Sequence, residues 1–266
     1  MSAASITTRH LREMKSEGRK ISVLTSYDAS MTRLLEEAGV EVLLVGDSLG
    51  NVIQGHESTL PVTVDEMVYH TRNVARARQR ALLVADMPFM SYRTPELALE
   101  SAGRLMKEGG AHMVKLEGGA PQLDVIRRIT DQGIPVCGHL GLIPQSVHKL
   151  GGYRVQGREA ERAEAMLEDA RALQQAGIDM LVLECVPSRL AAEITQALEV
   201  PVIGIGAGVA CDGQVLVVYD MLGMNPRPPR FVKDFLAEGG SILQAFKDYV
   251  AAVRESRFPT GQESFE

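Results

Sequence analysis

Val42-Leu43-Leu44-Val45 runs directly into Gly46-Asp47-Ser48, and this stretch decides the fold. A short, apolar, β-branched run of this kind is typical of a buried parallel strand. Residues just past the carboxyl end of such a strand face the region where ligands bind in α/β proteins. Asp47 could instead simply cap the next helix. Its meaning therefore depends on whether the pattern recurs.

The pattern does recur, because four further apolar runs each end in an ionisable residue. These runs occupy residues 82–85, 113–116, 135–138 and 180–183, and they are followed by Asp86, Glu117, His139 and Glu184. Since the carboxyl ends of parallel strands lie at one edge, we expect the acids and the histidine to converge on one site. Lys115 lies inside one run and points the same way as Glu117, because side chains of a strand alternate.

Eight candidate strands alternate with helical segments along the 266 residues. We expect strands at residues 21–26, 42–45, 82–86, 113–116, 135–139, 180–184, 201–205 and 215–220. This order predicts an α/β fold, a (β/α)8 TIM barrel that forms a single domain over residues 1–266. A doubly wound sheet would carry a dinucleotide-binding glycine motif after its first strand, and Ser26-Tyr27-Asp28 carries none. Residues 204–208 are glycine-rich but lack the full spacing of a phosphate loop, so we expect a tight turn.

The segments outside the strands complete this prediction. A short N-terminal helix at residues 6–16 is expected to cover the closed end of the barrel, and a broken helix is expected over residues 231–254. The polar C-terminal tail that follows is expected to be loosely held. Residues 140–157 are rich in glycine and include Tyr153 and Arg154, so they are a candidate lid over the site.

Composition and charge exclude several classes of protein. The net charge of −6 argues against nucleic-acid binding, which usually needs a basic face. No apolar run approaches the roughly 20 residues of a membrane span, and the N-terminus lacks the apolar core of a signal peptide. The three cysteines have neither metal-type spacing nor an even number for a disulfide framework. These features predict a cytoplasmic protein without nucleic-acid or membrane partners.

The strand-end acids suggest a magnesium site. Asp47, Asp86 and Glu117 offer hard oxygen donors, which favour Mg²⁺ or Mn²⁺ over zinc. Mg²⁺ usually takes only one or two carboxylates, so one of the three acids could act through water. Lys115 suits a substrate carboxylate, although it could also form a structural pair with Glu117. A metal beside a lysine suits a small α-keto acid, whose enolate the metal would stabilise.

Such chemistry also needs a general base. Glu184 is the leading candidate, since it stands among apolar neighbours at its strand end. The alternative is an acid that caps the helix after Pro187-Ser188. His139 is a candidate orienting group, or a structural histidine.

Together these motifs resemble the ketopantoate hydroxymethyltransferase family, also named 3-methyl-2-oxobutanoate hydroxymethyltransferase. The resemblance runs from about residue 6 to residue 265. The start, the loop at residues 226–229 and the tail depart slightly from the family pattern, which affects subunit contacts rather than chemistry. The motifs lie at residues 46–50, 54–63, 85–89, 114–119, 136–146, 151–153, 183–187 and 204–208.

The resemblance implies a Mg²⁺ enzyme that transfers a one-carbon unit from 5,10-methylenetetrahydrofolate to 3-methyl-2-oxobutanoate. It implies that Asp47 and Asp86 bind the metal, with Glu117 as the third acid of the metal site. It implies substrate contacts from Asp47, Ser48, Asp86 and Lys115, and Glu184 as the proton acceptor. It also implies a homo-oligomer, a decamer, of which composition gives no sign.

Two alternatives stay open on the sequence alone. One is a related Mg²⁺ barrel of the isocitrate lyase and phosphoenolpyruvate mutase group. Cys137-Gly138-His139 is similar to the catalytic Cys-Gly-His of the lyases, but it lies in an apolar strand, which favours a packing role. The other alternative is a barrel that only binds a ligand or a partner, and the loss of a strand-end group would have favoured it.

Overall fold

Eight parallel strands close into a barrel in the computed structural model, which describes residues 5–152 and 154–266. The strands follow one another around the barrel in chain order, and β8 pairs with β1. This architecture confirms the predicted (β/α)8 barrel. Residues 1–4 of the predicted domain and Tyr153 of the candidate lid lie outside the described residues. The strands are β1 Ile21–Thr25, β2 Val42–Val45, β3 Leu82–Asp86, β4 Met113–Lys115, β5 Val136–Gly141, β6 Met180–Glu184, β7 Val202–Ile205 and β8 Gly213–Leu216.

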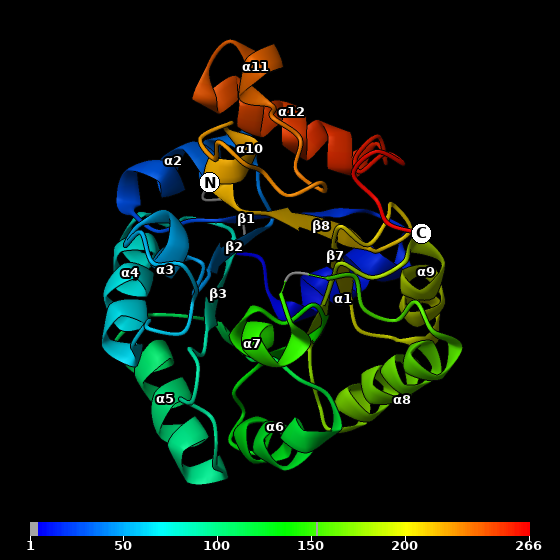
Figure 1. The fold of residues 1–266 in the computed structure, drawn as a ribbon. Helices are drawn as coiled ribbons and strands as arrows, with labels where there is room; N and C mark the ends of the chain where they lie inside the picture. The colour runs from blue at the N-terminus through cyan, green and yellow to red at the C-terminus, as the bar shows by residue number, and fades with distance from the viewer. Residues whose placement is uncertain (1–4, 153) are drawn as a thin grey trace.

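Helices form a ring around the strands (Figure 1). Their first turns carry the expected signals: α4 begins with a capping box between Thr63 and Glu66, and Thr94 caps α5 ahead of Pro95. The α-helices are α1 Thr8–Ser16, α2 Ala29–Ala38, α3 Leu49–Val52, α4 Val64–Ala77, α5 Pro95–Lys107, α6 Leu123–Thr130, α7 Val147–Leu150, α8 Ala160–Gln175, α9 Ser188–Ala197, α10 Val218–Met221, α11 Leu236–Gly239 and α12 Ile242–Arg254, and the 3₁₀ turns are η1 Ala120–Gln122 and η2 Pro144–Ser146.

Helix α1 lies against the amino ends of the strands. Lys15 donates hydrogen bonds to Asp212, just before β8, and to the carbonyl of Thr195. Arg12 pairs with Asp179, which immediately precedes β6. The helix also buries Leu11 in the core. These contacts place α1 at the closed end of the barrel, opposite the mouth formed by the carboxyl ends of the strands.

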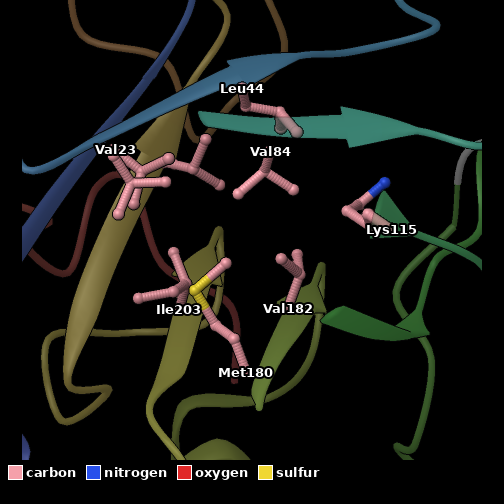
Figure 2. A pocket seen from close by; sticks show the side chains of 9 residues that line it. Val23, Leu44, Val84, Lys115, Met180, Val182 and Ile203 are labelled. Carbon is pink, nitrogen blue, oxygen red and sulfur yellow. The ribbon is translucent and has the colours of Figure 1, made fainter. Parts of the chain in front are cut away.

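The interior of the barrel is filled by apolar side chains from its strands. They surround a cavity of about 10 Å³, and Lys115 is the polar residue that lines it (Figure 2). A cavity of this size with one polar neighbour does not hold a water well. The residues below Lys115 offer its ammonium group no polar partner, so this group pairs with Asp86 toward the mouth.

The last strand differs from the prediction. An expected strand at residues 215–220 is wrong, because β8 spans Gly213–Leu216 and the chain then turns into α10. The amide of Val218 donates to the Thr25 hydroxyl, which anchors the start of α10 on β1. Gly213 is needed in β8, since a Cβ there would lie 2.3 Å from the Ile21 carbonyl oxygen.

The C-terminal region is also better ordered than expected. The broken helix expected over residues 231–254 is present as α11 and α12, with its break at Gly240, but its expected start is wrong, because residues 231–235 are not helical. The tail is not loose: the Phe265 carbonyl accepts hydrogen bonds from both the amide and the hydroxyl of Ser188. Figure 1 accordingly shows the C-terminus beside α9.

Candidate active site

The acidic side chains reach the mouth because of strand alternation. Three of the acids lie two positions beyond a residue that lines the interior cavity. They are Asp86, Glu117 and Glu184, which follow Val84, Lys115 and Val182. Since side chains two apart on a strand share a face, all three continue the inward face of the barrel toward its mouth.

Asp86 and Lys115 form the central ion pair of this cluster. The two residues are direct neighbours in the register of β3 and β4, and Lys115 Nζ lies 2.6 Å from Asp86 Oδ1. The other oxygen, Asp86 Oδ2, accepts a hydrogen bond of 3.0 Å from the amide of Asp47. Burial alone would lower the pKa of Lys115, but Asp86, Glu117 and Asp47 together raise it, so the ammonium stays charged.

Asp47 lies in an environment that opposes its ionisation. Burial raises the pKa of Asp47 well above its ordinary value, and the charges of Asp86 and Glu117 raise it further. One hydrogen bond, from Gln145 Nε2 at 2.8 Å, reaches Asp47 Oδ2. Neighbouring Ser48 is half-buried, and its hydroxyl lies 2.9 Å from the hydroxyl of Tyr27.

His139 lies between two carboxylates. Its Nδ1 is 3.4 Å from Glu117 Oε1, and its Nε2 is 3.3 Å from Glu184 Oε2. Both distances are longer than charge-assisted hydrogen bonds, and neither ring nitrogen has hydrogen-bond geometry toward a described residue. Burial and Lys115 lower the pKa of His139, but Glu117 and Glu184 outweigh them and raise it to about 9. Glu184 is thus not isolated among apolar groups, as the sequence suggested, but faces an imidazolium.

The cluster combines strong burial with an excess of negative charge. With all four carboxylates ionised and both Lys115 and His139 protonated, the cluster carries a formal charge of −2. The Glu184 side chain is 13% exposed, against 3% for Glu117 and His139, so Glu184 is the acid that best reaches the mouth. In the described part of the chain, no three Asp, Glu, His or Cys side chains are arranged to hold an ion by themselves.

Comparison with known proteins identifies the family. Residues 5–261 match the family model of ketopantoate hydroxymethyltransferase. The chain belongs to this family. A relative from Halorhodospira halophila, named 3-methyl-2-oxobutanoate hydroxymethyltransferase, is 59% identical and aligns over 100% of this chain and 96% of its own length. One of the same name from Nitrosococcus oceani is 58% identical over 98% of this chain and 99% of its own.

Solved structures support the fold. A 2,3-dimethylmalate lyase of the phosphoenolpyruvate mutase/isocitrate lyase superfamily has a TM-score of 0.59 at 19% identity, over 81% of this chain and 82% of its own. A phosphonopyruvate hydrolase, solved with oxalate and Mg²⁺, has a TM-score of 0.59 at 12% identity, over 95% and 99% of the two chains. Identities this low establish a shared barrel and no shared reaction.

Membership of the ketopantoate hydroxymethyltransferase family decides between the alternatives raised by the sequence. The lyase and mutase alternative is less well supported, since its relatives share only the fold. Burial also raises the pKa of Cys137 to about 12, so this thiol stays protonated and is not a reactive nucleophile. Because relatives that span the whole chain are named as enzymes, the purely ligand-binding barrel is not favoured either.

Two residues of the cluster were missed by sequence reasoning. Gln145, in η2, and Tyr92, in the loop after β3, are both buried beside the acids and hydrogen bond to each other. The sequence signals for Gln145 were its place in the family motif at residues 136–146 and in the stretch at residues 140–157 predicted as a lid. Whether that stretch moves stays a prediction.

The glycine-rich turn after β7 has a packing role. A Cβ at Gly206 would lie 3.0 Å from both Phe231 and Phe265, so the turn packs closely against the C-terminal segment. This contact agrees with the tight turn expected from the sequence.

The helices of the barrel are short or polar. Among the described residues, no helix is both long and apolar enough to cross a membrane.

Proposed function

We propose that this chain transfers a hydroxymethyl group, formed from the methylene of 5,10-methylenetetrahydrofolate and one molecule of water, to 3-methyl-2-oxobutanoate, giving 2-dehydropantoate and tetrahydrofolate. The observation that carries the proposal is the Asp47–Asp86–Lys115 cluster at the barrel mouth, in a chain that belongs to the ketopantoate hydroxymethyltransferase family. The carboxylates of Asp47 and Asp86 can bind a metal ion, and the ammonium of Lys115 can bind the carboxylate of a substrate. An α-keto acid would use both, the metal for its keto oxygen and the ammonium for its carboxylate.

A magnesium ion fits the residues that are present. A Mg²⁺ site needs only one or two protein carboxylates, because water and substrate complete its coordination. Asp47 and Asp86 would supply these, and a divalent cation would offset the formal excess of two negative charges. Glu117 already accepts a hydrogen bond from the Gln145 amide and faces His139, so we assign it to the metal site through water. When bound, Mg²⁺ would draw electron density from the keto oxygen and make the adjacent C–H more acidic.

Lys115 and Ser48 would bind the keto acid. The apolar residues below Lys115 favour an ammonium group that faces the mouth, where its Nζ lies 2.6 Å from Asp86 Oδ1. The carboxylate of the substrate would bind the Lys115 ammonium alongside Asp86. The Ser48 hydroxyl, held by Tyr27, lies next to Asp47 and can donate to a second substrate oxygen.

Glu184 would act as the general base. It accepts the single proton from C3 of 3-methyl-2-oxobutanoate, and the electron pair of that C–H bond forms the new C–C bond to the one-carbon unit. Both bonds of this unit to the folate nitrogens break, water supplies its hydroxyl group, and the C3 proton and the second proton of the water end on the folate nitrogens. Protonated His139, 3.3 Å away, would hold the carboxylate of Glu184 turned toward the mouth. His139 is thus a positioning residue in this proposal.

The direct test is the formation of 2-dehydropantoate by the purified protein from both substrates, with Mg²⁺ and with excess EDTA. We expect product with Mg²⁺ and its loss with EDTA. Cleavage of isocitrate or methylisocitrate by the same sample, without 2-dehydropantoate formation, would instead support the lyase alternative.

We also propose a cytoplasmic decamer. The decamer rests on the family resemblance. The cytoplasmic location rests on the three buried cysteines, which are free thiols and suit a reducing compartment.

A further inference from the structure

Gln145 is a buried amide that connects four loops at the mouth of the barrel. Its Nε2 lies 2.8 Å from Asp47 Oδ2 and 3.0 Å from the carbonyl oxygen of Met87. Its Oε1 accepts a hydrogen bond from the Tyr92 hydroxyl. Its backbone amide donates to Glu117 Oε2 at 3.0 Å. Segments that follow β2, β3, β4 and β5 therefore meet at this one residue.

The hydrogen-bond partners fix the orientation of the amide. The Met87 carbonyl can only accept, so the NH₂ group must face Met87 and, beside it, Asp47 Oδ2. The oxygen must then face Tyr92, whose hydroxyl can donate. A rotation of the amide by 180° would direct an oxygen at the Asp47 carboxylate and an NH₂ group at Tyr92. The network thus allows a single orientation of Gln145.

This arrangement restrains one oxygen of Asp47 and leaves the other free to bind a metal. Gln145 holds Oδ2, whereas no hydrogen bond from the described residues reaches Asp47 Oδ1. We propose that Gln145 is a positioning residue that orients the Asp47 carboxylate for Mg²⁺, an inference that rests on the metal site proposed above. Gln145 lies in η2, which follows β5. The position of η2 therefore affects the orientation of the Asp47 carboxylate through the hydrogen bond from Gln145.

The proposal is tested by metal binding in the absence of substrates. Mn²⁺, which prefers the same oxygen ligands as Mg²⁺, is titrated into the full chain by calorimetry. Gln145→Met keeps the size of the side chain but removes both polar groups. Loss of a residue that orients a metal ligand typically weakens metal affinity about 10–100-fold, so we expect the Mn²⁺ Kd to rise by that factor.

Gln214→Met is the matched control. Gln214, in β8, is also a buried glutamine, but its Nε2 donates to the Gly208 carbonyl and to none of the proposed metal ligands. We expect the Mn²⁺ Kd of this variant to equal that of the wild type. Circular dichroism melts of both variants show whether they fold.

Tyr92→Phe probes the same network without changing Gln145. It removes the hydroxyl that fixes the amide oxygen, so we expect a smaller rise in the Mn²⁺ Kd. This variant also serves as the test if Gln145→Met does not fold. A wild-type Mn²⁺ Kd in the folded variants of Gln145 and Tyr92 would overturn the inference.

Asp47→Asn separates this inference from the proposed function. If Asp47→Asn binds Mn²⁺ as the wild type does, the metal site itself is wrong, and the role of Gln145 is wrong with it. If Asp47→Asn loses Mn²⁺ binding while Gln145→Met and Tyr92→Phe retain it fully, only the role of Gln145 is wrong.

Discussion

At the scale of single residues, the buried charges at the mouth of the barrel depend on one another. Lys115 is surrounded by Asp86, Glu117 and Asp47, and the apolar cavity below it offers no partner. Breaking a buried ion pair by removing one member leaves an uncompensated charge and typically costs about 3–5 kcal/mol. Stability and substrate binding therefore both depend on this lysine, and a test has to separate them.

Lys115→Met is predicted to raise the KM for 3-methyl-2-oxobutanoate at least about tenfold, since a hydrogen bond to a charged group contributes roughly 1.5–3 kcal/mol. The KM for the folate should change little. Steady-state kinetics with each substrate varied in turn measure both. Lys15→Met is the matched control: it breaks the 2.7 Å pair with Asp212 at the closed end, so it should cost stability alone. A change confined to the folate KM would assign Lys115 to the other substrate.

His139 makes the free energy of unfolding depend on pH. Its pKa in the folded chain is about 9, above the ordinary 6.5, so the protonated form stabilises the fold. This contribution is fully present below pH 6.5 and is lost as the pH rises through 9. It amounts to no more than about 3 kcal/mol. Urea unfolding without added metal should show a falling free energy of unfolding over this window, and a weaker fall in His139→Asn. Equal slopes in the two proteins would contradict the assigned pKa.

At the scale of elements, close approach of backbones fixes where the site residues lie. Gly141 ends β5 with φ of 93°, opposite Glu184 in the register of β5 and β6. A Cβ at Gly141 would lie 2.2 Å from the Glu184 carbonyl oxygen. The glycine therefore lets β6 approach and places Glu184 at the mouth.

Gly141→Ala is predicted to lower both stability and kcat, because it must displace the backbone that carries Glu184. Gly133→Ala is the control, since Gly133 has φ of 76° but a Cβ added there would meet no described atom within 4 Å. A left-handed alanine alone costs about 1–2 kcal/mol, so the control should lose about that much and keep its kcat. Chemical denaturation and product assays compare the two. Equal effects of both substitutions would show that close contact at Gly141 is unimportant.

The elements also show how far sequence reasoning reaches. Apolar runs that end in charge, such as the one ending at Asp86, are local patterns, so most strands could be predicted. The bounds of β8 could not, because the strand begins at Gly213, a residue type with low strand propensity, while the apolar residues after it enter α10. The convergence of the acids follows from strand order, but Gln145 could not be found, since its partners come from loops distant in sequence.

At the scale of the whole molecule, the closed end and the proposed catalytic residues lie at opposite ends of the barrel. Helix α1 closes the amino ends of the strands through Lys15 and Arg12, and the apolar interior fills the middle. Every charged residue proposed for catalysis lies at the opposite end. This placement is general for such barrels, and in this chain Lys115 and His139 at the mouth contribute to stability as well.

The proposed decamer is tested by the mass of the protein in solution. Light scattering after gel filtration should give ten times the chain mass of 28.9 kDa. Exposed apolar side chains, among them Tyr69 and Met224, are available for contacts between subunits. A mass equal to one chain over a range of concentrations would refute the decamer.

Removal of the C3 proton by Glu184 is the central step of the proposed reaction, and hydrogen exchange measures it directly. In heavy water with Mg²⁺, the wild-type protein should exchange the C3 proton of 3-methyl-2-oxobutanoate for deuterium. Proton NMR measures this exchange as the loss of the C3 proton signal. Glu184→Gln is nearly isosteric and should still bind the keto acid, but its exchange should be slower by about 10²–10⁴-fold. Exchange at the wild-type rate in Glu184→Gln, together with its loss in His139→Asn, would contradict this role and make the histidine the base.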